Sequence, residues 1–267
     1  MRTTPDLLAI CHSRLSPEAY HNLEQWLTDP NYQEFVSEIM SFVEFHRWEE
    51  VEDSFYTHLT VGTGGIRGHL VTGPNRINRR IIGEAAQGLV EFMKSFGEKA
   101  LQGGVVIGYE VRKQSEDFAK LCCEIFAANG IKSHLFPHRC ATPELSFAIR
   151  HLKTTAGVMI TASHNPKTDN GFKFYWTDGG QVVPPLDEKF MDCVTSVKGI
   201  TRMPFEQAQK KSLIKSVPKE LDAAYLAAVR GLSLVKNRSA QIVFSPLHAA
   251  GSTNIFPVLT QEQFKVD

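Results

Sequence analysis

The chain has 267 residues, of which 42% are hydrophobic and 22% charged, so it is long and apolar enough to bury a sizeable core. Lysine and arginine number 29 and so do aspartate and glutamate, which excludes the strong overall field that attracts nucleic acid or an acidic membrane. The five cysteines lack paired zinc-site spacing, and no signal peptide or membrane span is visible, so we expect a soluble cytoplasmic protein without nucleic-acid or membrane partners.

The first 60 residues predict helices. Ser16-Pro17-Glu18 combines a capping serine, a first-turn proline and an early acid, and apolar residues recur at Phe35, Ile39 and Phe42. The charged and aromatic run from Glu44 to Phe55 continues this pattern. We expect a helical N-terminal extension that carries no chemistry of its own.

Four glycines then surround one arginine in Gly62-Thr-Gly-Gly-Ile-Arg-Gly68. Glycines let backbone N–H groups approach an anion closely, and the forked guanidinium of Arg67 matches a phosphate. The segment lacks the last glycine of a dinucleotide fingerprint and the Gly-Lys-Ser/Thr of a P-loop. A flexible hinge would have the same glycine content, but Arg67 favours a phosphate-facing loop in which Thr63, Gly64 and Arg67 bind the phosphate.

The middle of the chain alternates between helix and strand. An apolar stripe predicts a helix from Asn78 to Leu101, and later segments predict a βα alternation that ends in a returning strand and a helix. The expected strands are 105–109, 131–136, 157–160 and 172–176, and the expected helices are 115–129, 142–152 and 186–197. This pattern predicts an α/β fold with a mixed, largely parallel sheet flanked by helices.

The last part of the chain predicts a second domain. Residues 198–219 are polar and rich in lysine, which is typical of a crossing between domains, and a helix at 221–229 and a strand at 241–244 follow. So few residues could not bury enough apolar surface to form a stable α/β domain. We therefore expect one domain over residues 1–200, and a linker with the start of an incomplete second domain over 201–267.

The run Thr161-Ala-Ser-His-Asn-Pro166 follows the expected strand at 157–160, at the strand end where open α/β sheets bind ligands. A serine hydroxyl such as that of Ser163 becomes nucleophilic when a neighbour accepts its proton or a positive field stabilises its anion. His164, Lys167 and Lys173 are near enough in sequence to do this. A polar surface turn is the plain alternative.

A Ser-His hydrolase is disfavoured. Adjacent residues of an extended loop point apart, no G-x-S-x-G elbow surrounds Ser163, and no acid is paired with His164. The other histidines read as ordinary polar or core residues.

Gly108-Tyr-Glu-Val-Arg112 ends another expected strand. Glu110 could orient Arg112 toward an anion, or the two could form a surface ion pair of little energetic value. We favour a role in supporting the active site.

Taken together, Gly62-Thr-Gly-Gly-Ile-Arg-Gly68, Gly108-Tyr-Glu-Val-Arg112, Thr161-Ala-Ser-His-Asn-Pro166 and Asn170-Gly-Phe-Lys173 resemble the first domain of the α-D-phosphohexomutase superfamily of phosphoglucomutases and phosphomannomutases. Glu110 stands where many members have Asp. The segments Trp26-Leu27-x-Asp29 and Ser245-Pro-Leu-His-Ala-Ala-Gly251 are most similar to the branch with phosphoglucomutase 2, phosphopentomutase and glucose-1,6-bisphosphate synthase.

The resemblance implies roles for single residues. Ser163 would carry the exchangeable phosphoryl group, with His164, Arg67 and Lys173 as catalytic partners for proton transfer and charge stabilisation. Phosphate binding would fall to Thr63, Gly64, Arg67, Arg112 and Asn165. The implied reaction moves a phosphoryl group between C1 and C6 of a hexose, or C5 of a pentose, through a bisphosphate intermediate.

The resemblance also implies Mg²⁺ on a phosphate oxygen of phospho-Ser163, and glucose 1,6-bisphosphate or a related sugar bisphosphate as the phosphoryl primer. The partners would be sugar monophosphates and bisphosphates. The family's three metal-binding aspartates, an Asp-x-Asp-x-Asp loop, do not occur in these 267 residues, and neither do its sugar-reading and phosphate-gripping domains. We therefore expect an isomerase-type phosphotransferase sequence that is not competent alone, or else a non-catalytic binding or regulatory module of the same family.

Overall fold

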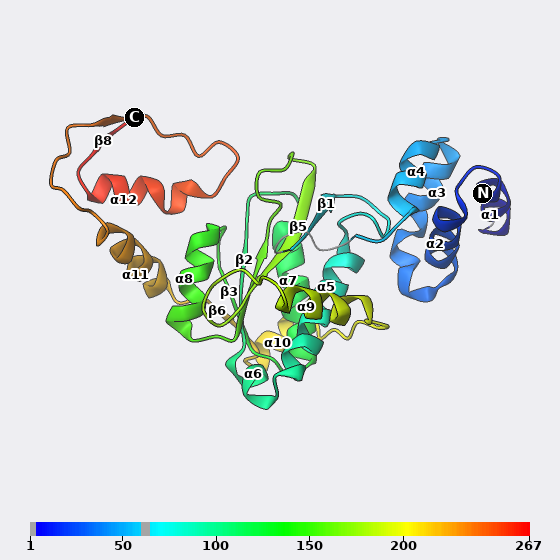
Figure 1. Cartoon of the computed structure of the whole chain (residues 1–267), viewed down its shortest axis with the longest axis horizontal. Coiled ribbons are helices and arrows are strands. Elements are labelled where there is room, and N and C mark those ends of the chain that lie inside the picture. The colour runs from blue at the N-terminus through cyan, green and yellow to red at the C-terminus, as the bar shows by residue number, and fades with distance from the viewer. Residues whose placement is uncertain (1–3, 60–64) are drawn as a thin grey trace.

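The computed structural model describes residues 4–59 and 65–267. A six-stranded sheet with helices on both faces occupies the centre of the molecule (Figure 1). A unit of short helices lies to one side of this body, and the C-terminal segment lies to the other (Figure 1).

The N-terminal unit has a hydrophobic core of its own. Ser16 caps the second helix by accepting a hydrogen bond from the Ala19 amide at 3.2 Å, as the sequence predicts. Trp26 is buried against the rings of Tyr32, Phe35 and Phe55. The elements are α1 (Thr4–His12), α2 (Pro17–Thr28), η1 (Pro30–Phe35), α3 (Val36–Glu44) and α4 (Trp48–Phe55), so the helix expected over 44–55 begins only at Trp48.

The central sheet has the strand order β1-β5-β4-β2-β3-β6. Neighbours β4, β2, β3 and β6 are parallel, while β5 runs antiparallel to both β4 and β1. The expected mixed, largely parallel sheet is therefore confirmed. The strands are β1 (Ile66–His69), β2 (Val105–Tyr109), β3 (Ser133–Leu135), β4 (Ala156–Ile160), β5 (Asp169–Tyr175) and β6 (Ile214–Ser216).

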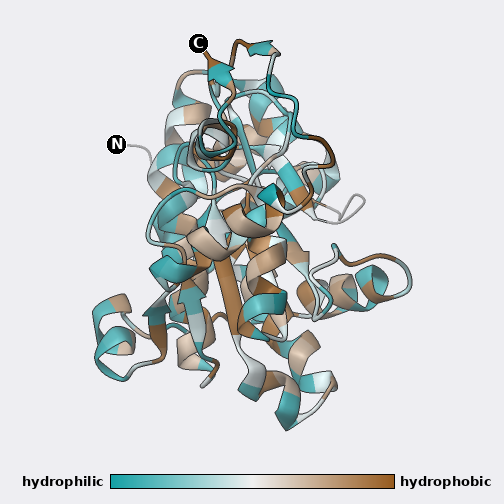
Figure 2. Ribbon diagram, turned by 90° about the vertical axis from the view of Figure 1, so that its left-hand side faces the viewer, coloured by the Kyte–Doolittle hydropathy of each residue, from teal (hydrophilic) through white to brown (hydrophobic). Residues whose placement is uncertain are grey.

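Helices cover both faces of the sheet because its strands are apolar on both sides, as the hydrophobic colour of the central strands shows (Figure 2). One face packs on α5 (Arg79–Ser95), α7 (Ser115–Ala128), α9 (Leu186–Thr195) and α10 (Phe205–Lys210). The other face packs on α8 (Thr142–Leu152) and α11 (Lys219–Arg230).

Two expectations from the sequence differ from the structure in the first half of the body. The helix expected from Asn78 to Leu101 is divided into α5 and α6 (Glu98–Gly103), because Gly97 adopts φ 85 between them. The second half of the glycine-arginine motif is the strand β1 and not a loop. Thr63 and Gly64 lie outside the described residues.

The polar segment 198–219 also differs from the expected crossing. It contains α10 and the strand β6, which pairs in parallel with β3 at the edge of the main sheet. Ile214 and Val217 are buried there. The division of the chain at residue 200 stays a prediction, but this segment contributes a strand to the same sheet as the residues before it.

The C-terminal segment forms a small βαβ arrangement. In it β7 (Gln241–Ile242) pairs in parallel with β8 (Lys265–Val266), and η2 (Gly251–Thr253) and α12 (Ile255–Gln261) lie between them in sequence. The side chain of Asn254 donates to Glu144 of α8 at 3.1 Å, which joins the segment to the body. None of the helices in the described part of the chain combines the length and apolar character needed to cross a bilayer.

Candidate functional site

The candidate site lies where the neighbouring parallel strands β2 and β4 end. Tyr109 and Ile160 are paired at these ends, so Glu110 and Thr161 follow side by side. The connection from β4 to β5 together with the first residue of β5, residues 161–169, is named the Ser163 loop here. Its position at the carboxyl ends of parallel strands is the place where open α/β sheets bind ligands.

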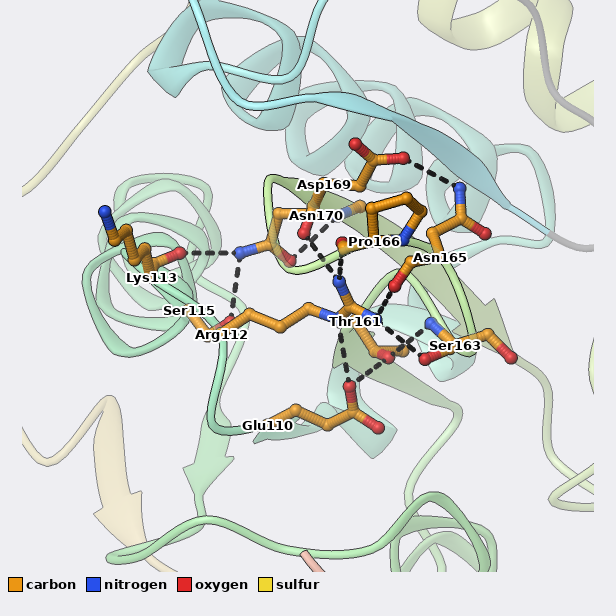
Figure 3. Close-up of polar contacts among 11 residues, drawn as sticks. Glu110, Arg112, Lys113, Ser115, Thr161, Ser163, Asn165, Pro166, Asp169 and Asn170 are labelled. Atoms are coloured by element: carbon orange, nitrogen blue, oxygen red, sulfur yellow. Dashed lines mark hydrogen bonds and ion pairs between the residues drawn. The ribbon is translucent and has the colours of Figure 1, made fainter. Parts of the chain in front are cut away.

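Ser163 lies exposed in the Ser163 loop with φ 58. Its backbone N–H donates to Thr161 Oγ1 at 2.9 Å, and this hydroxyl donates in turn to Glu110 Oε2 at 2.6 Å. The Ser163 side chain points away from Arg112 and out of this network (Figure 3). The backbone of Ser163 is therefore fixed while its hydroxyl stays accessible.

The guanidinium of Arg112 binds the backbone of the Ser163 loop (Figure 3). One terminal nitrogen donates to the carbonyls of Ser163 and Asn165 at 2.8 and 2.9 Å. The other donates to the carbonyls of Pro166 and Asp169 at 2.7 and 2.9 Å. All four terminal N–H groups are thus used by the loop, which assigns Arg112 a holding role; its expected contact with phosphate stays a prediction.

The two ends of the Ser163 loop are tied down as well. Asn165 donates from its side chain to Asp169 Oδ2 at 2.9 Å. Asn170 donates to the Lys113 carbonyl at 2.9 Å and to Ser115 Oγ, at the start of α7, at 3.0 Å. The loop is therefore attached to the connection between β2 and α7, to the start of α7 and to its own stem.

Lys173 and Arg67 lie on the same face of the sheet as Glu110 and Thr161. Arg67 in β1 pairs with Gly171 in β5, and side chains two residues apart in a strand share a face. Lys173 is only 8% exposed. Burial lowers the pKa of its ammonium group, the guanidinium of Arg67 lowers the pKa further, and Glu110 opposes this.

Tyr175 belongs to the same electrostatic cluster. Burial raises the pKa of Tyr175 to about 12, with Glu110 adding to the rise and Arg67 opposing it. Lys173 has no hydrogen-bond or ion-pair partner among residues 4–59 and 65–267. A lysine that is so largely buried without an acidic partner is an unusual arrangement, and it favours a role toward an anionic ligand.

Gly65 brings β1 close to Lys173. A Cβ atom at Gly65 would lie 2.5 Å from the Phe172 carbonyl oxygen and 3.0 Å from Lys173 Cγ, and its φ is 155. Only glycine permits this approach. The glycine-arginine motif therefore serves, at this position, to place Arg67 beside Lys173.

The structure thus brings Arg67, Lys173 and the Ser163 loop together, and it leaves His164 exposed without a hydrogen bond to any described residue. Sequence reasoning missed Thr161 as the link between Glu110 and the Ser163 amide. It also missed Tyr175. The alternation of β5 carries a signal for Tyr175, since it stands two residues after Lys173.

The residues present do not fit a Mg²⁺ site by themselves. No group of three or more His, Cys, Asp or Glu side chains that could hold a metal ion occurs among the described residues. The carboxylates nearest the loop are already used: Glu110 accepts from Thr161 and pairs with Arg112 at 3.4 Å, and Asp169 accepts from Asn165. Ser163 as a metal ligand through a phosphate, and Mg²⁺ itself, stay predictions.

The fold and the site define a class of protein: an α/β domain that presents a pre-positioned serine at the end of a parallel strand, beside a buried lysine and an arginine. The sequence model of phosphoglucomutase/phosphomannomutase, α/β/α domain I, matches residues 58–199. The chain therefore belongs to the phosphoglucomutase/phosphomannomutase family, as the resemblance predicts.

Individual relatives agree with this assignment. A phosphoglucomutase of Staphylococcus saprophyticus is 32% identical over 240 residues, which cover 88% of this chain and 42% of the relative. The probable phosphoribomutase of Schizosaccharomyces pombe is 27% identical over 248 residues, which cover 89% of this chain and 41% of that protein. The chain thus spans less than half the length of these relatives.

The fold recurs in solved structures. A Burkholderia thailandensis protein of the phosphoglucomutase/phosphomannomutase family matches with a TM-score of 0.60 at 14% identity, over 77% of this chain and 42% of that one. A Thermus thermophilus protein matches with a TM-score of 0.65 at 24% identity, over 79% of this chain and 45% of that one. At such identities the matches support the fold alone.

Proposed function

We propose that this chain is the nucleophile-bearing part of a sugar-phosphate mutase, in which Ser163 carries the phosphoryl group. The observation that carries the proposal is the exposed hydroxyl of Ser163 on a loop fixed by Arg112 and Thr161, together with the largely buried Lys173. The related phosphoglucomutase and probable phosphoribomutase support sugar phosphates as the substrate class, and the proposal includes both monophosphates and bisphosphates.

The proposed transfer runs in two balanced steps. A hydroxyl of a sugar monophosphate attacks the phosphorus of phospho-Ser163, the bond from phosphorus to Oγ breaks, and the hydroxyl proton passes to a base. In the second step Ser163 Oγ attacks the phosphorus of the other phosphoryl group of the bisphosphate, the bond from that phosphorus to the sugar oxygen breaks, and the base returns its proton to this oxygen. Lys173 suits the role of proton acceptor because its lowered pKa makes the neutral amine more available, and Arg67 stabilises charge on the phosphoryl oxygens.

The cofactor and the location belong to the same proposal. Mg²⁺ would bind the phosphoserine with ligands from outside this chain, and a sugar bisphosphate such as glucose 1,6-bisphosphate would prime Ser163. All five cysteines are free thiols, which supports a reducing, cytoplasmic location. Because the described residues hold no metal site, we propose that the chain turns over no substrate alone.

The test joins this chain to the remaining domains of the Staphylococcus saprophyticus phosphoglucomutase and adds glucose 1,6-bisphosphate with labelled phosphorus. We expect label on Ser163, none in Ser163→Ala, and unchanged labelling in Thr168→Ala, which removes another hydroxyl of the same loop. Label on a different residue would refute the nucleophile assignment.

A non-catalytic binding or regulatory module is the second candidate, favoured by the missing metal ligands. The purified 267-residue chain discriminates between the two. Binding of sugar phosphates without labelling of Ser163, in the joined protein as well as in the chain alone, would favour the module.

A further inference from the structure

A cavity of about 500 Å³ borders the Ser163 loop without including Ser163. This volume lies within the range of small-molecule sites. Arg112, Asn165 and Thr168 form its wall on the loop side, while Ser163, His164, Arg67 and Lys173 do not line it. The cavity is therefore separate from Ser163 and its expected catalytic partners, although it shares the loop and the expected phosphate-binding residues Arg112 and Asn165 with the candidate site.

Two lysines and two histidines line the cavity. Lys113 comes from the connection between β2 and α7, Lys167 from the Ser163 loop, His69 from the end of β1 and His248 from the C-terminal segment. No carboxylate lines the cavity in the described part of the chain. Two carboxylates contact its lining residues: Asp169 accepts from Asn165 at 2.9 Å and lies 3.6 Å from His69 Nδ1, and Glu110 pairs with Arg112 at 3.4 Å.

The two lysines are free to bind. Neither ammonium group has a hydrogen-bond or ion-pair partner within residues 4–59 and 65–267, and both side chains are exposed. Arg112 has no terminal N–H group left to donate to an anion, because all four are bound to loop carbonyls. Leu70 and Val111 add an apolar wall.

We propose that this cavity is a second anion site, which binds a phosphorylated small molecule with the ammonium groups of Lys113 and Lys167 on its phosphate. The apolar wall of Leu70 and Val111 accommodates the carbon part of the ligand. Because His248 of the C-terminal segment also lines the cavity, a bound ligand links this segment to the Ser163 loop. Binding there does not depend on phosphoryl transfer at Ser163, so this site can exist even where the proposed transfer fails.

The test measures binding by calorimetry at low salt, where exposed cations are least screened, to the 267-residue chain carrying Ser163→Ala. The probes are inorganic phosphate, glucose 6-phosphate and uncharged glucose. We expect both phosphates to bind, with glucose 6-phosphate tighter because of the apolar wall, and glucose not to bind. Equal affinities of the two phosphates would restrict the site to the free ion and overturn the small-molecule part of the proposal.

Variants distinguish binding in this cavity from binding at the candidate active site. Lys113→Ala with Lys167→Ala should weaken binding about tenfold or more, since each removes a charge-assisted contact. Lys99→Ala with Lys153→Ala, two lysines that line another cavity, is the matched control and should change nothing. Lys173→Met should leave this binding intact. The site would be refuted if the Lys113/Lys167 double variant kept its affinity for the phosphates, or if the control double variant lost as much affinity.

Discussion

Arg112 concentrates four hydrogen bonds on a single side chain that is 11% exposed. A planar guanidinium can reach four carbonyls at once, and an ammonium group cannot, because it is a compact charge with three donors on a flexible stem. The order of the Ser163 loop therefore depends on the shape of this residue as well as on its charge.

Arg112→Lys is expected to destabilise the fold by about 2 kcal/mol, because several loop carbonyls lose a charged donor while the charge itself is kept. Urea unfolding measures the change. Arg202→Lys is the matched control: Arg202 donates two bonds to Glu124 but its side chain is 43% exposed, so its loss should stay below about 0.5 kcal/mol. Equal costs in the two variants would contradict the holding role.

Lys173 predicts a pH dependence of stability. Its folded pKa lies below the ordinary value of 10.5, so between the two values the unfolded chain binds more protons and stability rises with pH. Lys173→Met removes the cost of burying the charge. We therefore expect the variant to be more stable than the parent at pH 7, with a difference that shrinks as pH rises toward 10.5.

Thermal unfolding across pH 7 to 10.5 measures this difference. A variant that is less stable than the parent at pH 7 would show that Lys173 is held by interactions that offset its burial.

At the scale of single residues, the sequence predicted Ser163, Arg67 and Lys173 through the motif in which they stand. It could not predict that Arg112 turns its donors to the loop carbonyls, because that choice depends on how the chain folds back between Ser163 and Asp169. Thr161 was hidden for the same reason: a threonine at a strand end gives no signal that its hydroxyl joins two segments 51 residues apart.

At the scale of elements, strand β1 connects the glycine-arginine motif to the sheet. Sequence patterns identified β2 and α8 with the bounds that the structure has, because each is a strongly periodic or continuous apolar run between clear ends. They missed β1, whose four residues contain a single apolar side chain, and β6, whose three residues contain one buried side chain. Both are edge strands, and an edge strand can have few apolar residues because less of it is covered by neighbours.

Gly65→Ala is expected to destabilise the protein by about 2–4 kcal/mol, because the new methyl group would collide with the backbone of β5. It should also reduce labelling of Ser163 in the joined protein, since Lys173 is displaced. Gly97→Ala is the matched control, with φ 85 and no atom within 4 Å of the added Cβ, and should cost about 1 kcal/mol. If the two variants lost equal stability, the close approach of β1 and β5 would be irrelevant.

At the scale of the whole molecule, one buried polar contact joins the C-terminal segment to the body. Glu144 in α8 is 1% exposed and accepts a hydrogen bond from Asn254. Burial raises the pKa of Glu144, the neighbouring Asp222 raises it further, and the Asn254 amide opposes this. His138 contacts Asp222 at 3.0 Å, so three segments meet at this point.

Glu144→Gln is expected to stabilise the protein at neutral pH, because it keeps an oxygen for Asn254 and removes a buried charge. With a folded pKa above the ordinary 4.5, the folded chain binds more protons, so Glu144 lowers stability as pH rises from 4.5 through its folded pKa. The gain in the variant should therefore vanish near pH 4. Thermal unfolding from pH 4 to 8 checks this, with the exposed Glu220→Gln as control; a gain independent of pH would contradict it.

The overall architecture followed from the sequence because alternating strands and helices leave few arrangements for a parallel sheet. The attachment of the C-terminal segment to the body did not follow from the sequence. It depends on Asn254 meeting Glu144 across 110 residues, and neither residue differs in pattern from the polar residues around it.

The left-handed backbone of Ser163 restricts which amino acids can occupy the position. At φ 58 a β-branched side chain is strained, so threonine is a poor replacement although it also carries a hydroxyl. Aspartate and asparagine accept this conformation more readily than most residues. The loop thus selects serine over threonine as its hydroxyl, and it offers Ser163→Asp as a fixed negative charge with which the phosphorylated form can be imitated at little cost to the backbone.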